Sequence, residues 1–133
     1  MKRTVLITGG ARGIGRQIAL DFGNAGYNVI INYNKSEKEA MSLVNELNAR
    51  EIACQAIQAD VSDGAQVKRM REQVAFGQVD TLVNNAGIAH IGLLQSDTED
   101  DFDRVIAVDL KGVWLCTREF LPSMVQNGFG RII

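Results

Sequence analysis

Hydrophobic residues follow two alternating patterns along this chain. Short apolar runs, rich in β-branched residues, predict buried strands at 4–8, 28–33, 52–59 and 79–83. Between these runs, apolar side chains recur every three or four positions, which predicts helices that begin near Ile14, Ser36 and Asp63. Strands that alternate with helices over short connections are typical of a parallel sheet covered on both faces. We therefore predict a doubly wound, Rossmann-like α/β fold.

Two of these helices carry candidate amino-terminal caps. Ser36 is followed three residues later by Glu39, which is the spacing of a capping box. Asp63 precedes a helix whose predicted apolar stripe is Val67, Met70, Val74 and Phe76.

The last third of the chain predicts one long helix and the start of a fifth strand. Apolar positions continue from Thr98, with Asp101 as a second capping residue, to about Gln126, and Gly112 interrupts the pattern. Gly130-Arg131-Ile132-Ile133 resembles the opening of a strand. We expect residues 1–133 to form a dinucleotide-binding domain that is incomplete at its carboxyl end. Exposed apolar side chains would then make the chain self-associate as a homo-oligomer; the candidates are Val113, Trp114, Phe120, Leu121, Ile132 and Ile133.

The composition of the chain mainly excludes classes of function. Of the 133 residues, 46% are hydrophobic and 23% charged, as in ordinary soluble domains. The net charge of −2 gives no electrostatic footprint for nucleic acid or an anionic membrane, and no apolar run is long enough to span one. Cys54 and Cys116 are isolated, so we expect free thiols, a cytoplasmic protein and no metal site.

The connection after the first strand is rich in glycine and opens a helix. Such a loop lets the backbone approach a pyrophosphate, and the free N–H groups of the first helical turn bind it. A plain turn is the alternative. The candidate phosphate-binding residues are Gly9, Gly10, Ala11, Arg12, Gly13, Ile14 and Gly15.

Two further segments follow predicted strands directly. Asp60-Val61 comes after the third strand and Asn84-Asn85-Ala86-Gly87 after the fourth. The carboxyl ends of parallel strands meet at one edge of a sheet, so these segments and the glycine loop should form a single site. Turn formation alone would also account for Asp60 or the asparagine pair.

Together these motifs resemble the classical short-chain dehydrogenase/reductases. The spacing Thr8-Gly9-x-x-x-Gly13-x-Gly15 is theirs, whereas the extended branch of that superfamily has glycine where this chain has Arg12. Within the family, the chain is most similar to the 3-oxoacyl-acyl-carrier-protein reductases. The matching segments are Arg12–Gly15, Asn32-Tyr33, Leu110–Val113 and Gly130–Ile133.

The resemblance implies roles for several residues. Asp60 would accept a hydrogen bond from the adenine amino group, with Val61 in backbone contact. Asn85, Ala86 and Gly87 would line the ribose on the nicotinamide side. The implied reaction is hydride transfer to a 3-oxoacyl thioester or a similar ketone, small or bound to an acyl carrier.

Cofactor choice follows from charge. An NAD site usually has a carboxylate after the second strand, but this chain has Asn32-Tyr33-Asn34-Lys35. The guanidinium of Arg12 can hold a 2′-phosphate by a two-point contact. We therefore predict NADP(H) rather than NAD(H).

The family's catalytic residues are not found in these 133 residues. Family members use a serine and a Tyr-x-x-x-Lys pair, but Tyr27 and Tyr33 are followed four residues later by Ile31 and Glu37. Asp109 stands where the family has an asparagine in a proton relay.

We therefore expect this chain to bind cofactor without reductase activity. A non-enzymatic NADP(H)-binding module is the alternative, and an unrelated flavodoxin-like or methyltransferase domain is a third possibility. His90, the single histidine, and Lys111 are expected to be exposed and non-catalytic.

Overall fold

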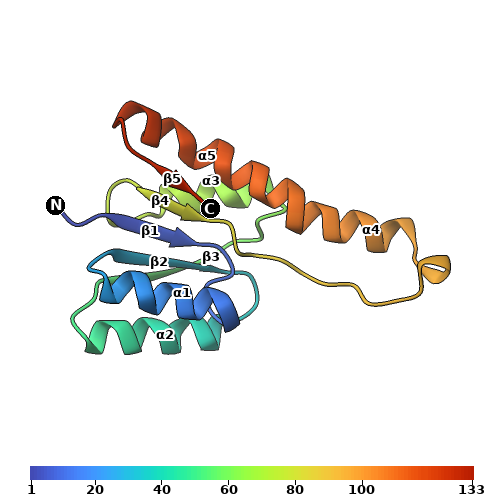
Figure 1. Cartoon of the computed structure of the whole chain (residues 1–133), viewed down its shortest axis with the longest axis horizontal. Helices are drawn as coiled ribbons and strands as arrows, with labels where there is room; N and C mark the ends of the chain where they lie inside the picture. The colour runs from blue at the N-terminus through green and yellow to red at the C-terminus, as the bar shows by residue number, and fades with distance from the viewer.

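The computed structural model describes residues 1–133 and contains one parallel sheet flanked by helices (Figure 1). Five strands lie in the order β3-β2-β1-β4-β5. The doubly wound fold is therefore confirmed. The elements are β1 Thr4–Ile7, α1 Gly13–Asn24, β2 Asn28–Tyr33, α2 Glu37–Ala49, β3 Cys54–Gln58, α3 Gly64–Glu72, β4 Thr81–Val83, η1 Leu94–Ser96, α4 Glu99–Ile106, η2 Ala107–Lys111, α5 Gly112–Gln126 and β5 Arg131–Ile132.

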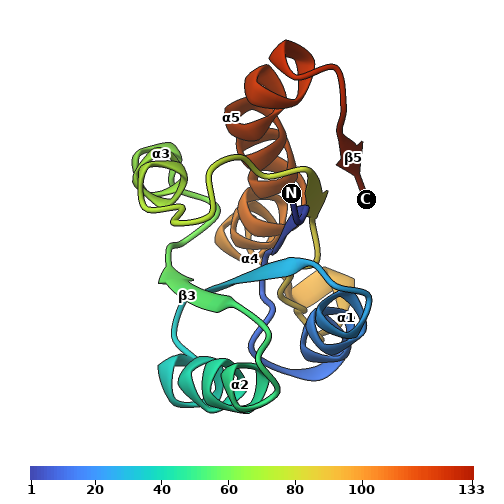
Figure 2. The same ribbon diagram turned by 90° about the vertical axis from the view of Figure 1, so that its left-hand side faces the viewer.

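Helices cover both faces of the sheet. Helices α1 and α2 lie on one face, and α3 and α5 lie on the other (Figures 1 and 2). Successive strand residues point to opposite faces, so in β1 Leu6 joins the α3–α5 core while Val5 and Ile7 join the α1–α2 core. This double burial explains why the strands are continuous apolar runs.

The direction of winding reverses between β1 and β4. From β1 the chain adds β2 and then β3 on one side, and then returns to pair β4 with β1 on the other side. Ligands of such sheets bind in the crevice outside the carboxyl ends of the strands at this reversal.

The ends of the first three helices differ from the sequence predictions in two places. The Ser36 side chain makes no capping bond, because its backbone (φ −90°, ψ 52°) is not in the extended conformation of an N-cap, so the predicted capping box is wrong. Asp63 does cap α3, since its carboxylate accepts from Ala65 N at 2.9 Å. Helix α3 ends at Glu72, so Val74 and Phe76 lie beyond it, although both still pack on the core.

The predicted long helix is present but is not uniformly α-helical. Thr98 and Asp101 form a capping box at the start of α4, as predicted. The irregular part is the π-helical segment η2, and Gly112 instead begins α5. A Cβ at Gly112 would lie 2.8 Å from Val61 Cγ2, so glycine permits the close approach of α5 to the end of β3.

The predicted exposed stripe is only partly correct. Trp114 and Leu121 are 56% and 42% exposed, but Phe120 is 2% exposed, because it faces the sheet and belongs to the core.

Two remaining expectations concern the cysteines and membrane spans. Cys54 and Cys116 are both free, and burial raises the pKa of each thiol to about 12. None of the helices combines the length and the apolar character needed to cross a bilayer.

Candidate functional site

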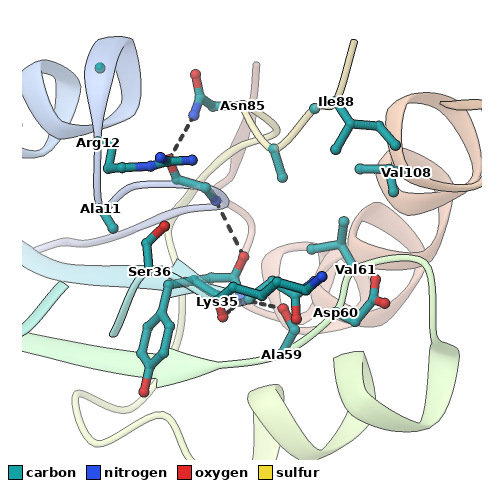
Figure 3. A pocket seen from close by; sticks show the side chains of 17 residues that line it. Ala11, Arg12, Lys35, Ser36, Ala59, Asp60, Val61, Asn85, Ile88 and Val108 are labelled. Atoms are coloured by element: carbon teal, nitrogen blue, oxygen red, sulfur yellow. Dashed lines mark hydrogen bonds between the residues drawn. The ribbon is translucent and has the colours of Figure 1, made fainter. Parts of the chain in front are cut away.

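A cavity of about 580 Å³ lies at the carboxyl ends of the strands. Four connections form it: those that follow β1, β2, β3 and β4. The π-helical segment adds one side chain. Figure 3 shows Arg12 and Ser36 toward one side and Val61, Ile88 and Val108 toward the other. The lining residues are Gly9, Ala11, Arg12, Gly13, Asn32, Tyr33, Asn34, Lys35, Ser36, Ala59, Asp60, Val61, Asn85, Ala86, Gly87, Ile88 and Val108.

The glycine loop is shaped by close backbone contacts. Gly9 has φ +61°, and a Cβ there would lie 2.9 Å from Ala86 Cα. A Cβ at Gly15 would lie 2.5 Å from both Gly9 O and Asn85 Nδ2. Any side chain at either position would therefore displace the loop from the β4 connection. Gly15 does not line the cavity, so its role is to allow this packing.

The amino end of α1 has no side-chain cap. Arg12 occupies the N-cap position but makes no capping bond, and the first turn contains no acidic residue. Unpaired N–H groups and the positive end of the helix dipole make such an end suitable for an anion. This end of α1 borders the cavity through Arg12 and Gly13.

Thr8 and Asn85 join the glycine loop to the end of β4. The Thr8 hydroxyl accepts from the backbone N–H groups of Asn85 and Ala86, each at 3.0 Å. The Asn85 amide donates to Thr8 O at 3.0 Å and to Gly9 O at 3.1 Å. Two walls of the cavity are thereby held in one relative position.

Asn32 connects the glycine loop to the backbone that follows β3. Its Oδ1 accepts from Gly9 N at 3.3 Å, and its Nδ2 donates to Ala59 O at 3.0 Å. The side chain is 2% exposed, so these bonds satisfy an amide that would otherwise be buried without partners. Asn32 therefore ties the loop after β1 to the end of β3.

The cavity lining contains two basic side chains and one acidic one. Arg12 and Lys35 both line it, and neither forms an ion pair. Asp60 is the one carboxylate among the lining residues, and its Oδ1 already accepts from Ser62 N and Oγ at 2.9 and 2.6 Å. The cavity is thus suited to an anionic ligand near Arg12.

Tyr33 contributes a neutral phenol to the same wall. Burial, followed by the negative charge of Glu37, raises the pKa of Tyr33 above its ordinary value. The group therefore remains protonated at neutral pH and adds no negative charge beside Arg12.

Asp109 holds the wall on the opposite side. It lies on η2, and its Oδ1 accepts from Ile88 N at 2.9 Å. A Cβ at Gly87 would be 3.5 Å from the same carboxylate, so the loop after β4 runs directly along it. π-helical segments are frequent at functional sites because they redirect side chains within a helix. Here the carboxylate reaches the loop that borders the cavity.

Most of the site residues predicted from the sequence meet at this cavity. The exceptions are Gly10 and Gly15, which pack inside the loop, and Ile14, which is 76% exposed. Sequence reasoning missed Lys35, Ser36, Ala59, Ile88 and Val108 as lining residues. Lys35, Ala59 and Ile88 directly flank predicted site residues, which was a usable signal, and Ser36 lies two residues beyond Asn34. No sequence signal identified Val108, because the π-helical part of the long helix places it at the cavity.

His90 lies outside the cavity, as an exposed loop residue. It is 3.0 Å from Asp97 Oδ1 and belongs to a separate cluster.

Comparison with known proteins decides the family. The sequence profile described as "short chain dehydrogenase" matches residues 3–133, which is nearly the whole chain. The chain belongs to the short-chain dehydrogenase family. The matched range includes the glycine loop and the Asn84–Gly87 segment, which follow β1 and β4.

A curated relative and two solved structures illustrate the similarity. The chain is 44% identical over 135 residues to a 3-oxoacyl-[acyl-carrier-protein] reductase FabG of Staphylococcus epidermidis, covering 100% of this chain and 55% of that protein. A blue fluorescent protein from a metagenomic library, solved in complex with NADPH, has a TM-score of 0.89 and 36% identity, covering 98% of this chain and 53% of that one.

A gluconate 5-dehydrogenase from Burkholderia cenocepacia, in complex with NADP and tartrate, has a TM-score of 0.87 and 33% identity; the match covers 99% of this chain and 52% of that one. The chain spans about half the length of the proteins it matches.

Proposed function

We propose that this chain is the NADP(H)-binding part of a short-chain reductase that acts on a 3-oxoacyl thioester or a similar ketone. The observation that carries the proposal is the cavity at the strand ends, where an uncapped helix terminus and Arg12 lie together. Similarity to a 3-oxoacyl-[acyl-carrier-protein] reductase supports the substrate class, and the NADPH and NADP complexes among similar structures support the cofactor. We extend the proposal to a cytoplasmic homo-oligomer.

The residues present fit a dinucleotide phosphate. Arg12 and Gly13 line the cavity at the uncapped amino end of α1, where the N–H groups of the first turn can receive the pyrophosphate. Arg12 and Lys35 can hold a 2′-phosphate, and none of the cavity-lining residues directly after β2 (34–36) is a carboxylate that could bind the free ribose hydroxyls of NAD. Asp60 and Val61 would border the adenine, and Asn85, Ala86 and Gly87 the ribose on the nicotinamide side.

When bound, NADPH supplies a hydride, and the chain's own residues bind and orient the cofactor. Protonation of the substrate oxygen needs an acid within hydrogen-bond reach. The serine and the Tyr-x-x-x-Lys pair that serve the family are not found in residues 1–133. We therefore expect the 133-residue chain to bind cofactor without reducing ketones.

Replacing Arg12 tests the cofactor proposal. Arg12→Ala removes a charge-assisted bond of about 1.5–3 kcal/mol, so NADPH affinity should fall about 10- to 100-fold while NADH affinity stays the same. Titration calorimetry measures both. Arg69→Ala is the matched control, because Arg69 is an exposed arginine on α3 outside the cavity. Equal losses for the two cofactors, or equal effects of the two variants, would refute the assignment of Arg12.

An activity assay tests the second half of the proposal. NADPH oxidation with an acetoacetyl thioester should stay at the background rate for this chain, because the proton donor is absent. Turnover comparable to that of a full-length relative would show that another residue supplies the proton, and His90 and Asp109 would then be the first variants to make.

The alternative of a non-enzymatic NADP(H)-binding module rests on the same absence of catalytic residues. The intact mass of the protein isolated from its native source distinguishes the two. A species of this length that binds NADPH favours the module, and a longer one containing the catalytic pair favours the reductase.

A further inference from the structure

The segment 88–98, here called the strap, lies largely outside both hydrophobic cores. It joins β4 to α4 and runs along the side of the molecule away from the sheet (Figure 1). Its only regular structure is the single turn Leu94–Ser96. Ile91, Leu93 and Leu94 are 96%, 66% and 87% exposed, so apolar burial does not hold the strap in place.

Hydrogen bonds fix the two ends of the strap. Ile88 N donates to Asp109 at the cavity end, and the Thr98–Asp101 capping box fixes the other end to α4. Between these anchors, one side-chain cluster crosses the strap. His90 Nε2 lies 3.0 Å from Asp97 Oδ1, and His90 Nδ1 lies 3.8 Å from Asp101 Oδ1.

The backbone of the strap is packed closely around this cluster. A Cβ at Gly92 would lie 2.8 Å from Asp97 Oδ1 and 3.1 Å from His90 Nε2. Glycine at position 92 therefore leaves room for the contact between His90 and Asp97.

We propose that His90, Asp97 and Asp101 form a proton-dependent clasp, which keeps the strap folded while the imidazole is charged and releases it when the imidazole is neutral. The charged ring donates from both nitrogens and offsets two carboxylates. A neutral ring has one N–H donor and so can donate to only one of them. Imidazole ordinarily changes charge between about pH 5 and 8.

Three charged groups lie around the ring or next to it. Asp97 faces it from the strap and Asp101 from α4, and Arg104 lies 3.4 Å from Asp101. Bonds from the Thr98 side chain and then its backbone, with His90 and Arg104 contributing less, hold the pKa of Asp101 below its ordinary value. The Asp101 carboxylate therefore stays charged at mildly acidic pH. Its negative charge is lost only as the pH falls through its lowered pKa. The clasp should be complete in mildly acidic solution and weaken as the pH rises toward 8.

Amide hydrogen exchange of the 133-residue chain, read by mass spectrometry on peptides from 89–97, tests the clasp. An exposed ion pair of this kind should slow exchange about two- to five-fold at about pH 5.5 relative to about pH 8, after correction for intrinsic rates. His90→Gln and Asp97→Asn should remove this pH dependence. Asp103→Asn, which deletes a charge from α4 without contacting His90, should retain it.

Three results would overturn the proposal. They are equal corrected exchange at the two pH values in the wild-type chain, a pH dependence that survives His90→Gln, and a pH dependence that disappears in Asp103→Asn. The last would show that the total charge of α4, and not the clasp, controls the strap. The outcome is independent of cofactor binding, so it does not depend on the proposed function.

Discussion

At the scale of single residues, the cavity depends on small residues as much as on charged ones. Gly15 does not line the cavity, yet it sets the distance between the glycine loop and Asn85. Thr8 works in the same indirect way, whereas Asn32 lines the cavity and also holds the glycine loop in place. The sequence indicated these positions through motif spacing, but it could not distinguish residues that line the cavity from residues that support it.

Gly15→Ala tests this indirect role. The new Cβ would meet a backbone oxygen, which cannot move alone, so overpacking should cost about 1–3 kcal/mol and NADPH binding should fall at least about tenfold. Gly64→Ala is the control, because its Cβ would meet the end of the Leu115 side chain at 3.3 Å. Chemical denaturation and calorimetry report the two effects. Unchanged binding in Gly15→Ala would mean that the loop does not need this packing.

At the scale of elements, the regular pattern was predictable and the irregular parts were not. Buried strands and amphipathic helices leave a periodic signal, so the succession of strands and helices along the chain followed from the sequence. The order of the strands within the sheet, β3-β2-β1-β4-β5, comes from the structure. The π-helical segment leaves no such signal, and it places Val108 at the cavity and Asp109 against Ile88 in the loop that borders the cavity. Ser36 had the right residue type for a cap, but its backbone conformation excludes that role.

A pair of cap variants tests the difference between Asp63 and Ser36. Asp63→Ala should lower the thermal midpoint, because Ala65 N and Gln66 N lose their acceptor, whereas Ser36→Ala should leave it unchanged. The side-chain bond from Gln66, with those from the two backbone N–H groups, lowers the pKa of Asp63. The stabilisation is therefore present above the ordinary carboxyl pKa and is lost as the pH falls through the lowered value. The difference in midpoint between Asp63→Ala and wild type should shrink in acid; a constant difference would argue against a charged cap.

At the scale of the whole molecule, the chain combines two well-packed hydrophobic cores with an uncovered apolar surface. Side chains along α4, η2 and α5 form an exposed stripe: Phe102, Ile106, Leu110, Trp114, Leu121 and Val125. Surfaces of this kind mark interfaces between proteins. The sequence predicted that Trp114 and Leu121 are exposed but wrongly included Phe120, because helical spacing alone did not show which side faces the sheet.

We expect this stripe to drive self-association. Light scattering should give a mass above that of one 14.6 kDa chain, and Trp114→Glu should shift it toward that of the monomer. Gln126→Glu, which adds the same charge outside the stripe, is the control. A monomer in the wild-type chain at tens of micromolar would exclude the stripe as an interface between copies.

We propose that these residues form a working NADP(H) site without the catalytic residues of the family. Calorimetric titration of the wild-type 133-residue chain with NADPH, and separately with NADH, measures both affinities. We expect saturable binding of NADPH at one site per chain, about ten times or more tighter than that of NADH. No saturable binding of NADPH, or equal affinity for the two cofactors, would contradict it.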